Sequence, residues 1–584
     1  MARLAVREAR GTGRSETPPR LAAALVRRRM VGIVVVVAVV VAMLVVPKVA
    51  STASAPAGSG ITYLPGQTHM NAPYSHGVAV SGVTCGPGVR QVPWSAYAPP
   101  CEPKWTGNNG GATAPGVTAT TITLSFRAAT SAILQALYTI VPKSVIGTSK
   151  EAEETLQAYI NVFNKNFELY GRHVVLASYV GQGNFINEDV GTGAAQAEAD
   201  AVNVATSLHA FADMSLVGSS VPYTEDLQAN NVISFGLYLQ DQQWYQQNAP
   251  WQYTPGPNCT KSARAIGELF GRQLKGTTAE FAKGALRGKV RKLGIIYQNT
   301  PTATACEQQM VQDLAAYGVH PAATAAVTFN VSKLADESAS AIAEMKKQGV
   351  TTVICSSCDP VSPQFYLSAA NQDNYHPEWF IQSLFGTGAT TSEKFIRLFP
   401  ANQRSQILTY GSAPTPTAQA EALKVFKMGN TDPTATIIPS YVFVYASVLQ
   451  FFDALQLAGP NLTPNNLEAA MRAIPTSLPG GELGGWSGSA GPFDPASTFQ
   501  VLHWNNHEPS QADGRLGTYD VCDNGTAYSF TGGGPQMPAH TQLTCEPGIS
   551  RAQLGAASPG GTGGAAGTAA ALGAVRREAG GRVR

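Results

Sequence analysis

Short apolar segments alternate with longer helical patterns over residues 117–535, and this alternation constrains the fold more than any other feature of the sequence. Near-continuous apolar strands joined by amphipathic helices are typical of parallel sheets covered by helices on both faces. We therefore predict an α/β fold of two doubly wound parallel-sheet lobes joined by a hinge. The predicted strands are 121–126, 173–180, 214–218, 232–236, 293–297, 351–355, 379–382 and 407–410.

One predicted helix can be located closely, because it carries both a start signal and a periodic apolar stripe. Thr148 and Glu151 have the spacing of a capping box, which predicts a helix beginning near Ser149. Apolar side chains then recur on one face of this helix: Leu156, Tyr159, Ile160, Phe163 and Phe167.

Length and composition set the class of protein. A chain of 584 residues exceeds one ordinary domain, and a hydrophobic content of 44% can bury a core in each of two or three domains. The formal net charge is +2, and charged residues make up only 13% of the chain. Nucleic-acid binding needs a concentrated basic field, so we predict no nucleic-acid partner.

The N-terminus indicates export. Residues 1–30 hold eight arginines and form a predicted basic cytoplasmic region, and an apolar run follows over 31–46. Segment 31–55 is therefore either a signal peptide, with the small residues 53–55 as its cleavage site, or a retained membrane anchor. Either alternative places the protein at the cell surface or in a periplasm-like space.

The two ends of the predicted globular part differ from it in composition. Residues 56–116 are rich in Gly and Pro and predict a loop-rich extension. Residues 546–584 are mostly Gly, Ala, Ser and Arg, too few apolar residues to offset the entropy of ordering, and predict a disordered tail.

The chain has eight cysteines, and an even count in an exported protein predicts disulfides. Neighbouring cysteines suggest four pairs, although the sequence leaves other connectivities open: Cys85 with Cys101, Cys259 with Cys306, Cys355 with Cys358, and Cys522 with Cys545. The first of these pairs would staple the N-terminal extension.

Catalytic and metal-binding motifs are incomplete. The segment 485–488 lacks the last glycine of a nucleophile elbow, because residue 489 is Ser. His507-Glu508 lacks the second histidine of a zinc-protease helix, and the nine histidines form no ligand-spaced cluster. We therefore predict a protein that is not an enzyme and that has no metal and no cofactor.

One motif leaves a redox alternative open. Cys355-Ser356-Ser357-Cys358 follows a predicted strand and precedes a helical stretch, where thiol-disulfide oxidoreductases place their cysteine pair. A structural disulfide that rigidifies the turn, or two free thiols, would explain the same residues.

Several segments carry a family resemblance through their order along the chain: 116–118 leading into 121–124, 169–176, 216–220, 293–297, 441–457, 491–494 and 499–504. They look like the mature start, the turn into the second strand, the third strand and its polar turn, the first strand of the second lobe, the late helix and the closing β segment of one family. This family is the type I periplasmic binding proteins that serve branched-chain amino acid ABC transporters. The resemblance implies a first lobe of 117–250 and 385–460 and a second lobe of 251–384 and 461–545.

The resemblance also implies a ligand held between the lobes, at the carboxyl ends of the strands, where loop N–H groups and helix N-termini are free. Side chains in such turns can instead bond local backbone, pack in the core, or pair as surface charges. The predicted ligand-binding residues are Arg127, Thr130, Ser219, Ser220, Tyr223, Tyr238, Tyr297, Asn299, Thr300, Ser356, Ser357, Leu384 and Phe385.

Two departures from the family bear on the ligand. Residues 127–131 replace the Ser/Thr- and Gly-rich loop that grips a carboxylate, and 383–387 hold no carboxylate to meet an amino group. A buried ammonium without a counter-charge is costly, so we expect an uncharged, amide-like or anionic solute. The predicted function is capture of a small polar solute, amino-acid-like, an amide or a small acid, for an ABC importer with a permease partner. A sensor or receptor on the same fold is the alternative.

Overall fold

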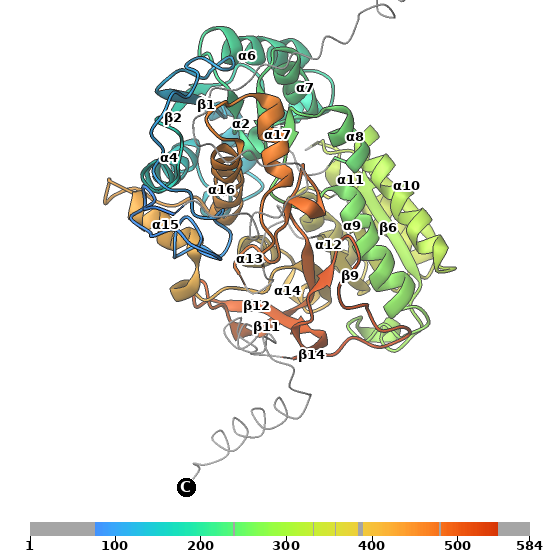
Figure 1. Ribbon diagram of the computed structural model, residues 1–584. Coiled ribbons are helices and arrows are strands. Elements are labelled where there is room, and N and C mark those ends of the chain that lie inside the picture. The colour runs from blue at the N-terminus through green and yellow to red at the C-terminus, as the bar shows by residue number, and fades with distance from the viewer. Residues whose placement is uncertain are drawn as a thin grey trace, which may run out of the picture. The chain divides into compact units, whose positions relative to one another are not determined.

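The computed structural model describes residues 76–236, 240–330, 332–356, 358–382, 389–477 and 481–546 (Figure 1). The predicted cytoplasmic region, the signal peptide or anchor, the start of the extension and the tail from 547 lie outside the described residues. So do four predicted site residues: Tyr238, Ser357, Leu384 and Phe385.

The first sheet has five parallel strands in the order β2-β1-β3-β4-β5, which is the doubly wound arrangement that was predicted. Its longest pairing, between β1 and the edge strand β2, joins Thr121 to His173 and runs to Ala128 opposite Val180. The strands are β1 (Thr121–Ala128), β2 (His173–Val180), β3 (Ala212–Asp213), β4 (Ile233–Phe235) and β5 (Gln252–Tyr253).

Helices cover both faces of this sheet, which explains why β1 is buried almost throughout. On one face, α4 (Ser149–Asn166) and α16 (Tyr441–Ala458) lie side by side, with Phe163 and Phe452 in ring contact at 5.2 Å (Figure 1). On the other face, α6 (Ala194–Thr206) and α7 (Val221–Ala229) enclose a separate apolar cluster. The predicted capping box is confirmed, because Thr148 and Glu151 each accept the other's backbone N–H.

The second sheet is mixed. Its parallel part follows the order β10-β9-β8-β6-β7, and antiparallel strands extend it from β10 through β11 and β12 to β14, with β13 paired to β11. The strands are β6 (Leu293–Gln298), β7 (Ala323–Val327), β8 (Thr352–Ser356), β9 (Glu378–Ile381), β10 (Ile407–Gly411), β11 (Thr498–Pro509), β12 (Leu516–Cys522), β13 (Tyr528–Ser529) and β14 (Cys545–Glu546).

The remaining helices connect and cover these strands, and several start at a side-chain cap such as Thr300 or Ser220. They are α2 (Ser131–Tyr138), α3 (Lys143–Ile146), α5 (Phe185–Asp189), α8 (Gln242–Gln247), α9 (Cys259–Ile266), α10 (Pro301–Ala316), α11 (Leu334–Lys347), α12 (Ser362–Gln372), α13 (Ala389–Ile396), α14 (Ala401–Arg404), α15 (Glu421–Gly429) and α17 (Pro464–Arg472). A π-helical turn, η3 (Gly267–Gln273), continues α9.

Among the described residues, α16 is the one helix that is long and apolar enough to cross a membrane. Within the protein, however, 89% of it is buried. Tyr445 and Phe452 of α16 pack against aromatic rings of α4. A helix that is apolar all round is typical of a core position, and α16 is the central core helix beside the first sheet.

Three boundaries differ from the predictions. The third strand ends at Asp213, and 216–218 form a 3-10 turn rather than a strand, because Leu216 has φ +55 and cannot continue extended backbone. β5 belongs to the first sheet, although it falls in the range 251–384 predicted for the second lobe. β10 belongs to the second sheet, although 385–460 was predicted to return to the first lobe; α16 is the part that does return. Strand partners are chosen by tertiary packing, which a local pattern does not encode.

All four predicted disulfides are confirmed, and the part of the chain that the structure describes has no free cysteine. Cys85–Cys101 staples the described part of the extension, as predicted. The extension also packs onto the core, since Trp94 stacks on Phe163 of α4 and the Tyr97 hydroxyl donates to the Gly484 carbonyl at 3.0 Å.

Candidate ligand-binding site

A cavity of about 500 Å³ lies between the two sheets. The first sheet contributes residues that follow β1, β3 and β4, and the second contributes residues that follow β6, β7 and β8. In each sheet the strand order reverses at this point, between β1 and β3 and between β6 and β8. Ligands of open α/β sheets bind at such switch points, because the connections diverge there and leave a crevice.

Much of the cavity wall is apolar and comes from α2, α3 and α5. The helix α2 has no buried residue at all, although its sequence is largely apolar, and Leu134 and Leu137 are only half-buried. The apolar wall residues of these helices and their flanks are Leu134, Leu137, Val141, Val145, Ile146, Phe185, Ile186 and Val190. Apolar surface that stays uncovered beside a cavity is typical of a binding site.

The second-sheet wall combines Phe329, after β7, with polar groups after β6 and β8. Asp359 accepts backbone N–H groups from Val361 at 2.7 Å and Ser362 at 2.9 Å, and the Gln298 side-chain amide at 2.8 Å. The hydroxyl of Ser362 also donates to Asp359. Four donors therefore hold this carboxylate, and its main role is to fix the turn after β8 against the end of β6.

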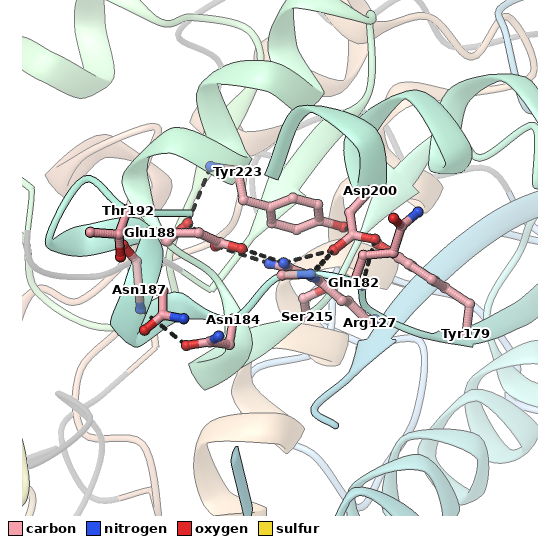
Figure 2. Close-up of polar contacts among 12 residues, drawn as sticks. Arg127, Tyr179, Gln182, Asn184, Asn187, Glu188, Thr192, Asp200, Ser215 and Tyr223 are labelled. Atoms are coloured by element: carbon pink, nitrogen blue, oxygen red, sulfur yellow. Dashed lines mark hydrogen bonds and ion pairs between the residues drawn. The ribbon is translucent and has the colours of Figure 1, made fainter. Parts of the chain in front are cut away.

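Arg127, at the end of β1, lines the cavity but is only 3% exposed. Figure 2 shows its guanidinium between Glu188 of α5 and Asp200 of α6. Its Nε donates to Asp200 at 2.9 Å, one terminal nitrogen donates to Glu188 at 3.1 Å, and the other contacts both carboxylates. The Tyr223 ring of α7 lies 4.3 Å from the guanidinium carbon, a cation–π distance.

This network joins one cation to two carboxylates in a buried setting. Burial lowers the pKa of Arg127, but the hydrogen bond and charge of Glu188 and the charge of Asp200 raise it above its ordinary value. Ser220 adds a donor to Glu188 at 2.5 Å, and the backbone N–H groups of Gln182 and Gly183 donate to Asp200 at 2.9 Å. Arg127 thus ties α5, and with it part of the apolar wall, to the first sheet.

Asp189 is the last residue of α5 and also lines the cavity. Asp189 is an exposed residue, so a solute in the cavity can reach its side chain, although neighbouring protein atoms partly desolvate the carboxyl group. Burial and the charge of Glu188 raise the pKa of Asp189 to about 7, and a hydrogen bond from the Val221 backbone N–H at the start of α7 opposes the shift.

The cavity brings together four of the predicted ligand-binding residues: Arg127, Ser219, Asn299 and Thr300. The buried position of Arg127 excludes the alternative of a solvated surface charge. Among the described residues, five further predictions do not line it. Thr130 caps α2, Ser220 caps α7, and Tyr223 donates to Asp213 at 3.1 Å. Tyr297 packs against the second apolar cluster, and Ser356 is buried within β8.

The sequence reasoning missed Asp189, Phe329 and the apolar residues of α2, α3 and α5. One signal was present: the apolar stretch 131–146 follows the first strand directly, at the position of the expected binding loop. Asp189 gave no signal, because only folding brings the end of α5 to the cavity.

The redox alternative gains no support from the geometry. Cys355 and Cys358 form a disulfide in which the two residues are 1% and 6% exposed. A catalytic cysteine needs an accessible sulfur, so this pair has the environment of a structural disulfide. Within the described ranges, no group of three His, Cys, Asp or Glu residues could hold a metal ion.

Two α/β sheets with a cavity at both switch points define a protein of the solute-binding class. A family model described as "Periplasmic binding protein" matches residues 145–505, more than half of the chain, and the chain belongs to this family. Family members are solute-binding proteins that act outside the cytoplasm. A search among curated proteins found no match to this sequence.

Three solved structures illustrate the similarity. A solute-binding protein of an ABC transporter from Rhodopseudomonas palustris HaA2, in complex with p-hydroxybenzoic acid, is 12% identical with a TM-score of 0.47, covering 69% of this chain and 97% of that one. One from Rhodopseudomonas palustris BisB5, with 3,4-dihydroxybenzoic acid, is 11% identical with a TM-score of 0.48, covering 70% and 98%. One from Desulfitobacterium hafniense, with Leu, is 12% identical with a TM-score of 0.43, covering 68% and 99%.

Proposed function

We propose that this protein captures one small solute in the cavity between its sheets and delivers it to the membrane permease of an ABC importer, without transforming it. The observation that carries the proposal is the cavity of about 500 Å³, which is walled by strand ends of both sheets. Movement of one sheet toward the other would remove a bound solute from water and would reopen to release it.

In this proposal the residues of the wall have distinct roles. Ser219, Asn299 and Thr300 contact the solute from the two sheets, and the apolar side chains of α2 and α3 cover its body. Arg127 is a positioning residue, because Glu188 and Asp200 already occupy most of its donors. Membership of the family supports an extracytoplasmic location. The basic region and the apolar run 31–46 favour export and retention near the membrane.

A sensor or receptor role on the same fold is a second candidate, and the extension favours it. Residues around Trp94 and Tyr97 pack on α4 and on the segment near Gly484, so the extension adds a structured surface beyond the two sheets. Genes for a permease and an ATPase beside the gene for this protein would favour transport over sensing.

The test is a thermal-shift screen of the full chain against amino acids, amides, sugars, small acids and amines. A solute present at a hundred times its Kd stabilises the folded state by about 2.7 kcal/mol. Leu137→Asp places a charge in the apolar wall and should abolish the shift. Met428→Asp, at an exposed apolar position of α15 outside the cavity wall, is the matched control and should preserve it. The proposal fails if no solute in the screen stabilises the protein, or if both variants bind equally.

A further inference from the structure

The charge balance of the cavity wall is negative. Among the described wall residues, Arg127 is the one cationic side chain, and it is outnumbered by Glu188 and Asp200 within its own network. The other two ionisable wall residues are Asp189 and Asp359, both acidic. An anionic solute would enter this wall against its field, whereas a cation would be attracted.

The two acidic wall residues are not equivalent. Asp359 is held by four donors from the protein and has little capacity left for a ligand. Asp189 receives the Val221 N–H, and no described Lys or Arg side chain forms an ion pair with it. A carboxylate has about four acceptor positions, so Asp189 can still accept several hydrogen bonds from a solute in the cavity.

A second polar group of the wall comes from the segment that contacts Asp189. Ser219 lines the cavity, is only 6% exposed, and its hydroxyl has no hydrogen-bond partner in the structure. It stands two residues before Val221, whose N–H contacts Asp189, so the hydroxyl and the carboxylate belong to the same corner of the wall. A buried hydroxyl without a partner is costly, and a ligand N–H group would satisfy it.

The part of the cavity wall formed by α2 and α3 contributes no charged side chain to the lining. Leu134, Leu137 and Ile146 present apolar surface that the protein itself leaves partly uncovered. Removing this surface from water stabilises a complex by about 25 cal/mol per Å², provided that the solute is apolar where it touches the wall.

We propose that the cavity takes a solute with an apolar body and a cationic amine head, which pairs with Asp189 and Ser219 while the body lies against α2 and α3. The inference rests on the proposed function, and it replaces the uncharged or anionic solute expected from the sequence with a cationic one, because Asp189 supplies the carboxylate that 383–387 lack. The raised pKa of Asp189 agrees with it, since a carboxylate in this wall lacks a counter-charge until an ammonium group arrives.

The experiment is calorimetric titration of the full chain at pH 8 with matched series that differ only in the head group. The amines are phenethylamine, tryptamine and hexylamine; the acids are 3-phenylpropanoate, indole-3-propanoate and heptanoate; the alcohols are 2-phenylethanol, tryptophol and hexanol. We expect at least one amine to bind at least tenfold more tightly than its alcohol, because a charge-assisted hydrogen bond contributes about 1.5–3 kcal/mol.

Variants then assign the effect to the corner of the wall. Asp189→Asn should weaken amine binding about tenfold or more and leave alcohol binding within about twofold, since only the charge is lost. Asp336→Asn, at an exposed position of α11, is the matched control and should change neither. Ser219→Ala should weaken amine binding by about threefold. This second variant tests the same part of the wall if Asp189→Asn does not fold.

The possible outcomes separate the two proposals. Tighter binding of an acid than of its amine, or equal amine binding by Asp189→Asn and Asp336→Asn, overturns the amine inference and leaves solute capture standing. Failure of every amine while a sugar or an amide stabilises the protein in the wider screen has the same meaning. Failure of both the amines and the wider screen overturns the proposed function as well.

Discussion

The buried network around Arg127 makes the sharpest prediction about stability. The change is Arg127→Met, which keeps a long unbranched side chain and removes the guanidinium. Glu188 and Asp200 are then left without a cation, although their side chains are 0% and 1% exposed. Breaking a buried ion pair by removing one partner is destabilising, because the remaining charge keeps its desolvation cost.

The size of the effect follows from these contacts. Loss of one partner of a buried pair costs about 3–5 kcal/mol, and the cation–π contact with Tyr223 adds about 1 kcal/mol. We therefore expect a loss of about 4–6 kcal/mol in the free energy of unfolding. For a folded unit of roughly 450 residues, with an unfolding entropy of about 2 cal/mol/K per residue, this corresponds to a fall in Tm of about 4–7 °C.

The measurement is urea denaturation combined with scanning calorimetry of the full chain, with Arg287→Met as the control at an exposed arginine. The control should change stability by less than about 0.5 kcal/mol. The double variant Arg127→Met with Glu188→Gln also removes one of the two unpaired buried carboxylates. It should recover at least about 1 kcal/mol of the lost free energy of unfolding. A loss for Arg127→Met no larger than that of the control, or no recovery in the double variant, would refute the view that this network ties α5 to the first sheet.

Three further predictions concern the Arg127 network, the disulfides and Asp189. Gly183→Ala should lower the free energy of unfolding by about 1–3 kcal/mol, because a Cβ there would contact Glu188 and lie 2.5 Å from the Arg127 guanidinium. The control is Gly86→Ala, whose Cβ would meet nothing closer than 3.9 Å, and its stability in urea denaturation should be nearly unchanged. Replacing Cys259 and Cys306 by Ser should cost about 4 kcal/mol and replacing Cys355 and Cys358 about 2 kcal/mol, since the closed segments span 47 and 3 residues; equal losses would contradict this order. Amine binding should weaken about tenfold per pH unit as the pH falls below about 7, because the raised pKa of Asp189 means that its carboxyl group is protonated there. In calorimetric titrations, the amine affinity of Asp189→Asn should not change with pH over this range.

The sequence predicted the strands and helices well where the pattern is local. The β1 and β2 segments, the capped start of α4 and the four disulfides follow from apolar periodicity, cap spacing and the proximity of cysteines along the chain. It failed where partners are distant: β10 joins the second sheet and α16 the first, although both lie in one predicted segment. The long antiparallel extension through β11 and β12 was likewise expected only as a short closing segment.

For the site, the sequence determined which residue types follow each strand. This was enough to predict four residues that line the cavity: Arg127, Ser219, Asn299 and Thr300. Tertiary structure alone decided what these residues are available to do. In the folded protein Arg127 forms ion pairs with Glu188 and Asp200. Folding also brings Asp189 and apolar residues of α2 to the cavity wall. The physical reason is that a local pattern fixes the chemistry of a side chain, whereas its free charge and its unmet hydrogen bonds depend on neighbours that only folding supplies.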